Sequence, residues 1–169
     1  MQKKFFSFFL LALFAVGPAI AQDKRGPSTE AERTKALAAI DDLEKNPLGP
    51  DAKEERRWLT IWLIEVPDVT VSVCTLLPDL PKGDKKDSDI IFGQMMFSAA
   101  RYVILHLDKP QNKLAEYQEG VAGVLKVYRF LLAQNPKDRQ PKLDDLVQRQ
   151  DAGTLDAYVQ EKAATACKN

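Results

Sequence analysis

Residues 114–131, LAEYQEGVAGVLKVYRFL, form the most regular stretch of this 169-residue chain. Large apolar side chains recur there at alternating steps of three and four, at Leu114, Tyr117, Val121, Val124, Tyr128 and Leu131. This spacing places them along one side of an α-helix. The seam covers under three heptads, which favours a position inside a bundle over a coiled-coil dimer. We predict a helix that starts near Asp108 and Pro110 and ends at Asn135-Pro136.

Two glycines interrupt this helix at Gly120 and Gly123. A glycine inside a helix costs about 1 kcal/mol relative to alanine, so two of them indicate a close neighbour. Close packing of another helix is the favoured explanation, and a ligand resting on the bare backbone is the alternative.

Further helical patterns precede and follow this stretch. They cover residues 29–46, 51–66, 90–106, 141–149 and 155–166. The predicted N-terminal capping residues of these helices are Thr29, which forms a capping box with Glu32, then Asp51, Ser88 or Asp89, and Thr154. The connections are short, so the sequence predicts an all-α, single-domain bundle of about five to seven helices.

The sequence around residues 69–73, VTVSV, is ambiguous. Its alternation is typical of a strand, but Val66, Val69, Val73 and Leu76 also follow helical steps. A strand needs a partner, and the only other β-rich run is 102–107. Because an isolated two-stranded pair is marginal, we predict a helix here, with one short strand pair as the alternative.

The first 21 residues have the parts of a secretory signal peptide: Lys3 and Lys4, the apolar run 5–16, and Ala19-Ile20-Ala21. The apolar run is shorter than the roughly 20 residues that span a bilayer, and Gly17-Pro18 follows it. We expect cleavage before Gln22, a mature domain of residues 22–169 without a stable membrane anchor, and a periplasmic or secreted location.

The composition excludes several classes of protein. Hydrophobic residues make up 45% of the chain, and 24 basic residues balance 24 acidic ones. This balance argues against a disordered chain and against a nucleic-acid-binding protein.

Both cysteines, Cys74 and Cys167, lie in the predicted mature domain. Two thiols in an oxidising compartment usually pair. The alternatives are two free thiols and a metal site, for which two cysteines and the single His106 form a poor ligand set. We predict a structural disulfide and assign His106, which lies near a helix end, a structural role.

One constellation merits attention as a candidate site. Trp58, Trp62 and Glu65 share one helix face, and Glu65 lies between Ile64 and Val66. An unpaired carboxylate in such surroundings has a raised pKa, as in catalytic and ligand-binding acids. We favour the other explanation, a buried pair with Arg101, which is similarly surrounded by apolar residues. The predicted ligand-binding residues are therefore Trp58, Trp62, Glu65 and Arg101.

No standard catalytic motif occurs in the sequence, so two functional classes remain. We favour an exported, non-enzymatic helical module that binds a protein of the cell envelope or a small apolar ligand. The Met95-Met96-Phe97 run offers an adaptable apolar surface for this, although core filling is the commoner use. The alternative is a small hydrolase with Glu65 and Asp68 as its catalytic acids in a helical cleft. Neither reading requires a cofactor or metal, and we expect a monomer.

Overall fold

The computed structural model describes residues 25–72, 74, 76–77 and 85–167, most of which lie in helices. The elements are α1 (Glu30–Lys45), α2 (Ala52–Glu65), α3 (Lys85–Leu105), α4 (Lys113–Gln134), the 3-10 turn η1 (Pro136–Asp138), α5 (Pro141–Asp151) and α6 (Leu155–Ala166). The predicted all-α bundle is confirmed, with six α-helices in one body of described residues. The predicted signal peptide lies outside the described residues.

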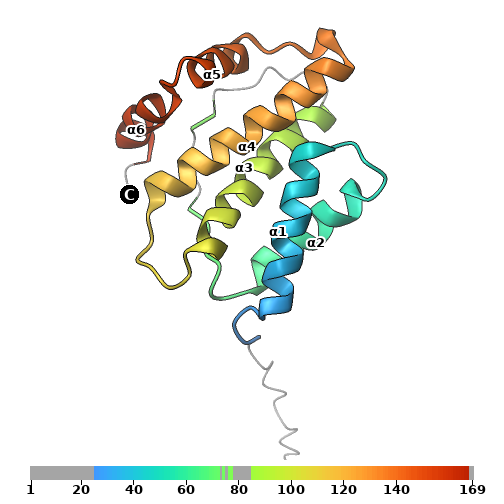
Figure 1. Ribbon diagram of the computed structural model, residues 1–169, viewed down its shortest axis with the longest axis vertical. Helices are drawn as coiled ribbons and strands as arrows, with labels where there is room; N and C mark the ends of the chain where they lie inside the picture. Colours follow the sequence, from blue (N-terminus) through green and yellow to red (C-terminus); the bar gives the residue numbers. More distant parts are fainter. Residues whose placement is uncertain (1–24, 73, 75, 78–84, 168–169) are drawn as a thin grey trace, which may run out of the picture.

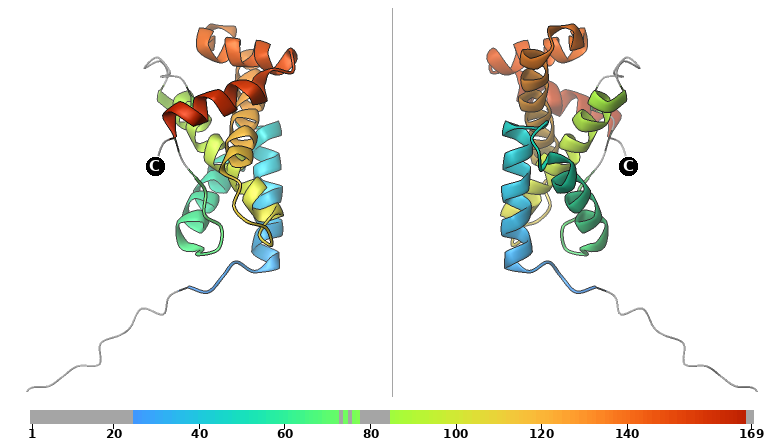
Figure 2. Two further views of the ribbon diagram at one scale, coloured as in Figure 1. Left: turned by 90° about the vertical axis from the view of Figure 1, so that its left-hand side faces the viewer. Right: turned by 90° about the vertical axis from the view of Figure 1, so that its right-hand side faces the viewer.

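The antiparallel pair α3–α4 is the centre of the bundle (Figure 1). The side views in Figure 2 place α5 and α6 towards the upper end of this pair, and α1 and α2 lower down. Five of the six predicted seam residues of α4 are buried and Leu114 is half-buried, so the predicted bundle position of this helix is confirmed.

The apolar core consists of two clusters along the central pair. One joins the start of α3 to α4, α5 and α6, and includes Ile91, Leu125 and Leu143. The other joins α1 and α2 to the second half of α3, through residues such as Ile40 and Phe97. Every helix therefore contributes apolar side chains to one cluster or the other, and α3 contributes to both.

A polar cluster is buried at the crossing of α1, α3 and α4. The side chain of Glu44 is only 6% exposed. Its Oε1 accepts a hydrogen bond from Ser98 Oγ at 2.7 Å, and its Oε2 lies 2.9 Å from Arg101 Nη2 and 2.7 Å from Lys126 Nζ. Burial alone would raise the pKa of Glu44, but Lys126, Arg101 and Ser98 together hold it below its ordinary value.

The two glycines of α4 make room for this close crossing. A Cβ at Gly123 would lie 1.9 Å from Ser98 Oγ and 2.8 Å from Glu44 Oε1. A Cβ at Gly120 would lie 2.8 Å from the carbonyl oxygen of Met95 on α3. Close helix packing, rather than a ligand on bare backbone, therefore explains both residues.

The helix starts agree only in part with the predicted caps. The Thr29–Glu32 capping box is present. Asp51 and Thr154 are N-cap residues, but neither side chain makes a capping hydrogen bond. Asn112 caps α4 by accepting a hydrogen bond from the Ala115 amide, so the helix begins later than Asp108 and Pro110 predict.

The start of α3 also differs from the prediction. The helix begins at Lys85, five residues before the predicted start at residue 90. Ser88 and Asp89 therefore lie inside the helix and do not cap it. The acidic and polar character of its first turns explains why the apolar pattern begins only at Ile90.

The predicted helix over residues 69–73 is wrong for the part described. Residues 69–72 are in neither a helix nor a strand, and Val73 lies outside the described residues. Val69 is only 2% exposed and belongs to the core. The core position of Val69 thus holds the segment against the bundle without the regular hydrogen bonding of a helix or strand.

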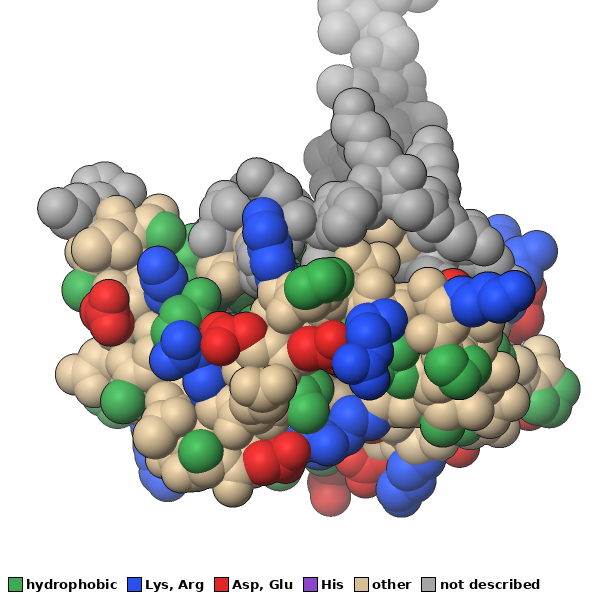
Figure 3. Space-filling view, turned by 90° about the horizontal axis from the view of Figure 1, so that it is seen from above, with side chains coloured by type: hydrophobic (Ala, Val, Ile, Leu, Met, Phe, Trp, Pro, Cys, Tyr) green, Lys and Arg blue, Asp and Glu red, His purple; other side chains and the backbone are tan. Residues whose placement is uncertain are grey.

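None of the helices in the described ranges combines the length and apolar character that crossing a membrane requires. On the face of the bundle seen from above, basic and acidic side chains are interspersed (Figure 3). That face therefore presents no surface of a single charge.

Candidate functional site

The connection between α2 and α3 builds a hollow beside the central helix pair. The described part of this connection, here called the crossing segment, comprises residues 66–72, 74, 76 and 77. It runs from the lower end of α2 towards the upper part of the bundle (Figure 1). Between it and the helices lies a hollow of about 550 Å³.

The hollow is lined mainly by apolar side chains. The crossing segment contributes Ser72, Cys74 and Leu77, α3 contributes Phe92, Met95 and Met96 among others, and α4 contributes Tyr117. Ser72 and Asp89 are its polar members. A mostly apolar hollow of this size with a few polar groups is typical of small-molecule binding sites.

The sequence left two uses open for the Met95-Met96-Phe97 run, core filling and an adaptable apolar surface, and the structure shows one methionine in each position. Met95 and Phe97 are buried in the core, as the commoner use predicts. Met96 is half-buried and lines the hollow, and Phe92, one turn earlier, is 48% exposed. Flexible methionine side chains suit a surface that adapts to an apolar partner.

The wall formed by the crossing segment has a polar anchor. The backbone N–H of Ser72 donates a hydrogen bond to Glu116 Oε2 at 2.9 Å, and Gln111 Nε2 donates to Ser72 Oγ at 3.0 Å. Leu76 and Leu77 are buried in the core beyond it. These contacts hold a segment that lacks the hydrogen bonds of regular structure.

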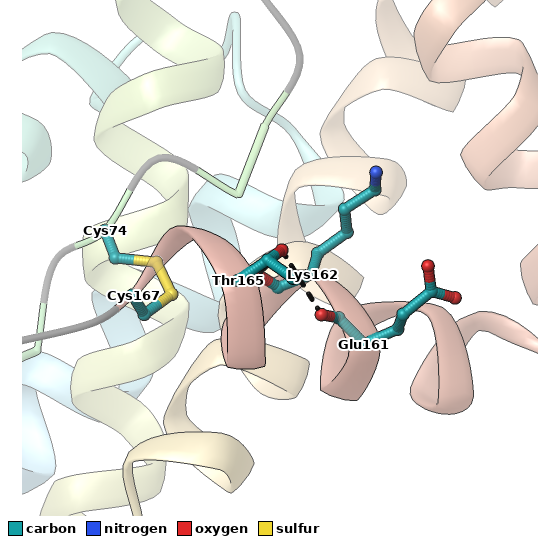
Figure 4. Close-up of a disulfide and its surroundings, with 5 residues drawn as sticks. All are labelled: Cys74, Glu161, Lys162, Thr165 and Cys167. Atoms are coloured by element: carbon teal, nitrogen blue, oxygen red, sulfur yellow. Dashed lines mark hydrogen bonds between the residues drawn. A yellow bond between two sulfur atoms is a disulfide. The ribbon is translucent and has the colours of Figure 1, made fainter.

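The second anchor is the pair of cysteines. Cys74 of the crossing segment and Cys167 at the end of α6 lie at disulfide distance, with Cα atoms 5.4 Å apart (Figure 4). Both pack against the core cluster that includes α4 and α5. The predicted pairing therefore agrees with the structure, and it ties one wall of the hollow to α6.

Reduction of this disulfide should lower thermal stability. The bond closes a loop of 93 residue steps, for which the chain-entropy estimate is an upper value of about 4–5 kcal/mol. We expect a loss of about 2–4 kcal/mol and a Tm lower by about 5–15 °C. Calorimetry with and without a dithiol reductant measures the difference. Two titratable thiols in the native, air-exposed protein would contradict the pairing.

Trp58 and Trp62, two of the predicted ligand-binding residues, pack against each other on α2. Trp58 and Trp62 stack with ring centroids 5.6 Å apart. Trp62 is buried, and Lys35 Nζ lies 4.1 Å from the centre of the Trp58 ring. Both rings pack in the core cluster of α1 and α2. The structure thus places them away from the lining of the apolar hollow.

The predicted Glu65–Arg101 pair is wrong. Glu65 is half exposed, and Arg25 Nη1 donates to its Oε2 at 3.1 Å. Arg101 instead forms ion pairs with Asp41, Glu44 and Glu119 at 2.9–3.0 Å. Glu65 lies on the solvent side of α2, because Leu59 and Trp62 define the buried side of that helix.

Asp68 is held by the N-terminal segment. Its two carboxylate oxygens accept hydrogen bonds from Ser28 N and Ser28 Oγ, both at 2.7 Å. Burial alone would raise the pKa of Asp68, but these bonds and the nearby Arg33 keep it below its ordinary value. Glu65 and Asp68 therefore both fasten residues 25–28 to the end of α2.

His106 has the structural contacts expected at a helix end. Its Nδ1 lies 2.8 Å from the carbonyl oxygen of Tyr102, and the two rings stack 4.1 Å apart. In the part of the chain that the structure describes, no group of three His, Cys, Asp or Glu side chains is placed to hold a metal ion.

Sequence reasoning missed Glu116 and the hollow itself. An acid in the first turn of a helix is ordinarily explained by the helix dipole, so Glu116 gave no signal of its own. The lining residues come from three distant parts of the chain. The apolar pair Phe92 and Met96, four residues apart on α3, is the one sequence signal that could have indicated it.

No family model, curated protein or solved structure matches the chain. The geometry of the site is therefore the basis for any functional assignment.

Proposed function

We propose that this protein is an exported, non-enzymatic helical module that binds a small apolar molecule in the hollow between the crossing segment and α3. The observation that carries the proposal is the hollow of about 550 Å³ with its mainly apolar lining. Burying an apolar ligand there gains about 25 cal/mol per Å² of apolar surface removed from water. Ser72 and Asp89 supply polar groups that can orient such a ligand.

Two observations support export. The cysteines lie at disulfide distance, and disulfides persist mainly in oxidising compartments. The signal-peptide pattern of residues 1–21 adds the targeting signal. A periplasmic or secreted location after cleavage before Gln22 is thus part of the proposal, as is the monomeric state.

The hydrolase alternative has less support. It needs Glu65 and Asp68 to face one substrate, whereas Arg25 pairs with Glu65 and Ser28 donates two hydrogen bonds to Asp68. Catalytic acids need a free oxygen within hydrogen-bond reach of the reacting group. We therefore favour binding over catalysis.

Replacing Gly93 by leucine should close the hollow while leaving the fold intact. A Cβ at Gly93 meets only the Phe97 ring, at 3.6 Å, which is ordinary contact, and Gly93 lines the hollow. The longer side chain should fill the space, and removing a helical glycine gains up to about 1 kcal/mol. We expect binding of the apolar fluorescent probe N-phenylnaphthylamine to weaken by about tenfold, or 1.4 kcal/mol.

The matched control is Ala133→Leu, which adds a leucine to an exposed position of α4 and should leave probe affinity unchanged. Saturable probe binding to the wild type that Gly93→Leu does not weaken would contradict the assignment to this hollow. A wild-type protein that fails to bind apolar probes would contradict the proposed function.

A further inference from the structure

Glu116 is a buried acid whose charge has no partner in the described part of the chain. It lies in the first turn of α4 and is 1% exposed. Its Oε2 accepts a hydrogen bond from the Ser72 amide, but its Oε1 is shielded from solvent and has no hydrogen-bond partner. None of the ion pairs among the described residues includes Glu116.

The contrast with Glu44 makes this arrangement unusual. Glu44 is similarly buried, but Arg101 and Lys126 balance its charge. Acidic residues are almost never fully buried unless they are paired, and an unpaired buried polar group destabilises the folded state. An unpaired acid at Glu116 therefore lowers the stability of the folded protein, and such a loss is typical of functional sites.

Glu116 is one of the residues that line a second hollow of about 210 Å³, together with residues of the crossing segment, the end of α3 and the connection from α3 to α4. Tyr102 and Val103 of α3 contribute apolar surface to its lining, and the lining residue Lys109 is exposed. Asp68 also lines this hollow, but Ser28 already occupies both of its oxygens. The free acceptor is therefore Glu116 Oε1.

The charges of this hollow favour a cation. Two acids, Glu116 and Asp68, line it, and the bases among its described lining residues are one lysine, Lys109, and one histidine, His106. A carboxylate ligand would be repelled by Glu116. A metal ion would need further ligands, and the described residues include no group of three that could supply them.

We propose that this hollow binds an organic ammonium group, with Glu116 as its counter-ion. A charge-assisted hydrogen bond from the ammonium to Oε1 satisfies the unpartnered oxygen. The alkyl part of the ligand lies against Tyr102 and Val103. A hollow of about 210 Å³ is smaller than a typical drug-sized site, which fits a small primary amine or a single lysine side chain.

The test is a titration of the oxidised, full mature chain with propylammonium chloride, followed by NMR. The amide resonance of Ser72 reports directly, because it donates to Glu116. We expect a saturable shift of this resonance below about 50 mM, since one charge-assisted contact gives millimolar affinity. Propanol at equal concentration, in matched sodium chloride, should give no such shift. N-acetyl-lysine methylamide in a parallel titration separates a partner's lysine from a free amine.

Glu116→Gln supplies the decisive variant, because its amide oxygen can still accept from the Ser72 amide. We expect at least tenfold weaker propylammonium binding and a Tm that stays equal or rises. Asp108→Asn, an exposed neighbour, should change neither result. Equal shifts with propanol, unchanged binding in Glu116→Gln, or a Tm several degrees lower in that variant would each overturn the proposal. A Lys109→Met variant with a lower Tm would show that Lys109 itself is the counter-ion, and would overturn it as well.

Discussion

Gly123→Val should cost at least about 3 kcal/mol of the free energy of unfolding, enough to unfold a marginally stable domain near physiological temperature. A Cβ at this position would lie 1.9 Å from Ser98 Oγ and 2.8 Å from Glu44 Oε1. Neither atom can move freely, because Ser98 is fully buried and bonded to both Gln94 and Glu44. The new side chain must therefore separate α4 from α3 or disrupt the polar cluster.

Urea unfolding at neutral pH measures this loss. Ala122→Val, at the neighbouring position of the same helix, is the matched control, because it adds the same β-branched side chain at a half-buried site. It should cost less than about 1 kcal/mol. A difference between the two variants of under 1 kcal/mol would show that the crossing of α3 and α4 is looser than the structure indicates.

Glu44→Gln should be nearly as damaging. The carboxylate balances Arg101, whose side chain is 13% exposed, and Lys126. Removing one member of a buried ion pair typically costs about 3–5 kcal/mol. We expect about 3 kcal/mol, since Asp41 and Glu119 still contact Arg101.

Asp41→Asn provides the control, because Asp41 pairs with the same arginine but is 56% exposed. Exposed ion pairs contribute under about 1 kcal/mol. Equal losses in Asp41→Asn and Glu44→Gln would mean that burial does not distinguish the two contacts.

The same carboxylate makes stability depend on pH. Because the pKa of Glu44 is held below its ordinary value of 4.5 in the folded protein, its contribution is complete above that value. It is lost as the pH falls through the folded-state pKa. Between neutral pH and strongly acidic pH, the wild type should therefore lose more stability than Glu44→Gln.

The local sequence pattern was sufficient to predict the helices and the close packing of another helix against α4. The seam of α4, the capping box at Thr29 and the two glycines all depend on spacing within one helix, and the structure agrees with each. The pairing of Cys74 with Cys167 followed from their number alone.

The burial of individual acidic side chains depends on contacts between distant parts of the chain, so the local pattern could not predict it. Ile61 and Ile64 precede Glu65 in the sequence but are themselves exposed, so apolar neighbours along the chain gave a false impression of burial. Nothing in the sequence indicates that Glu44 is buried, yet it lies against Ser98 in the space that Gly123 leaves open. No short-range pattern contains those partners.

The crossing segment shows the same limit. Its strand-like alternation reflects Val69 facing the core, not pairing with a second strand. The hollow depends on this segment, so its position could be located only after the path of the segment was known.

The pairing of Cys74 with Cys167 also sets an order of events during synthesis. Cys167 follows Cys74 by 93 positions, and at about 5–20 residues per second the second thiol emerges roughly 5–20 s after the first. Glu116 and the helices α3 and α4, which line the apolar hollow, are themselves made within that interval. Until the disulfide forms, the crossing segment depends on its buried side chains and, once α4 has been made, on the hydrogen bond between Ser72 and Glu116. A ligand that arrives before oxidation thus meets a hollow whose wall is not yet tied to α6. A ligand that arrives afterwards meets a hollow with the disulfide in place.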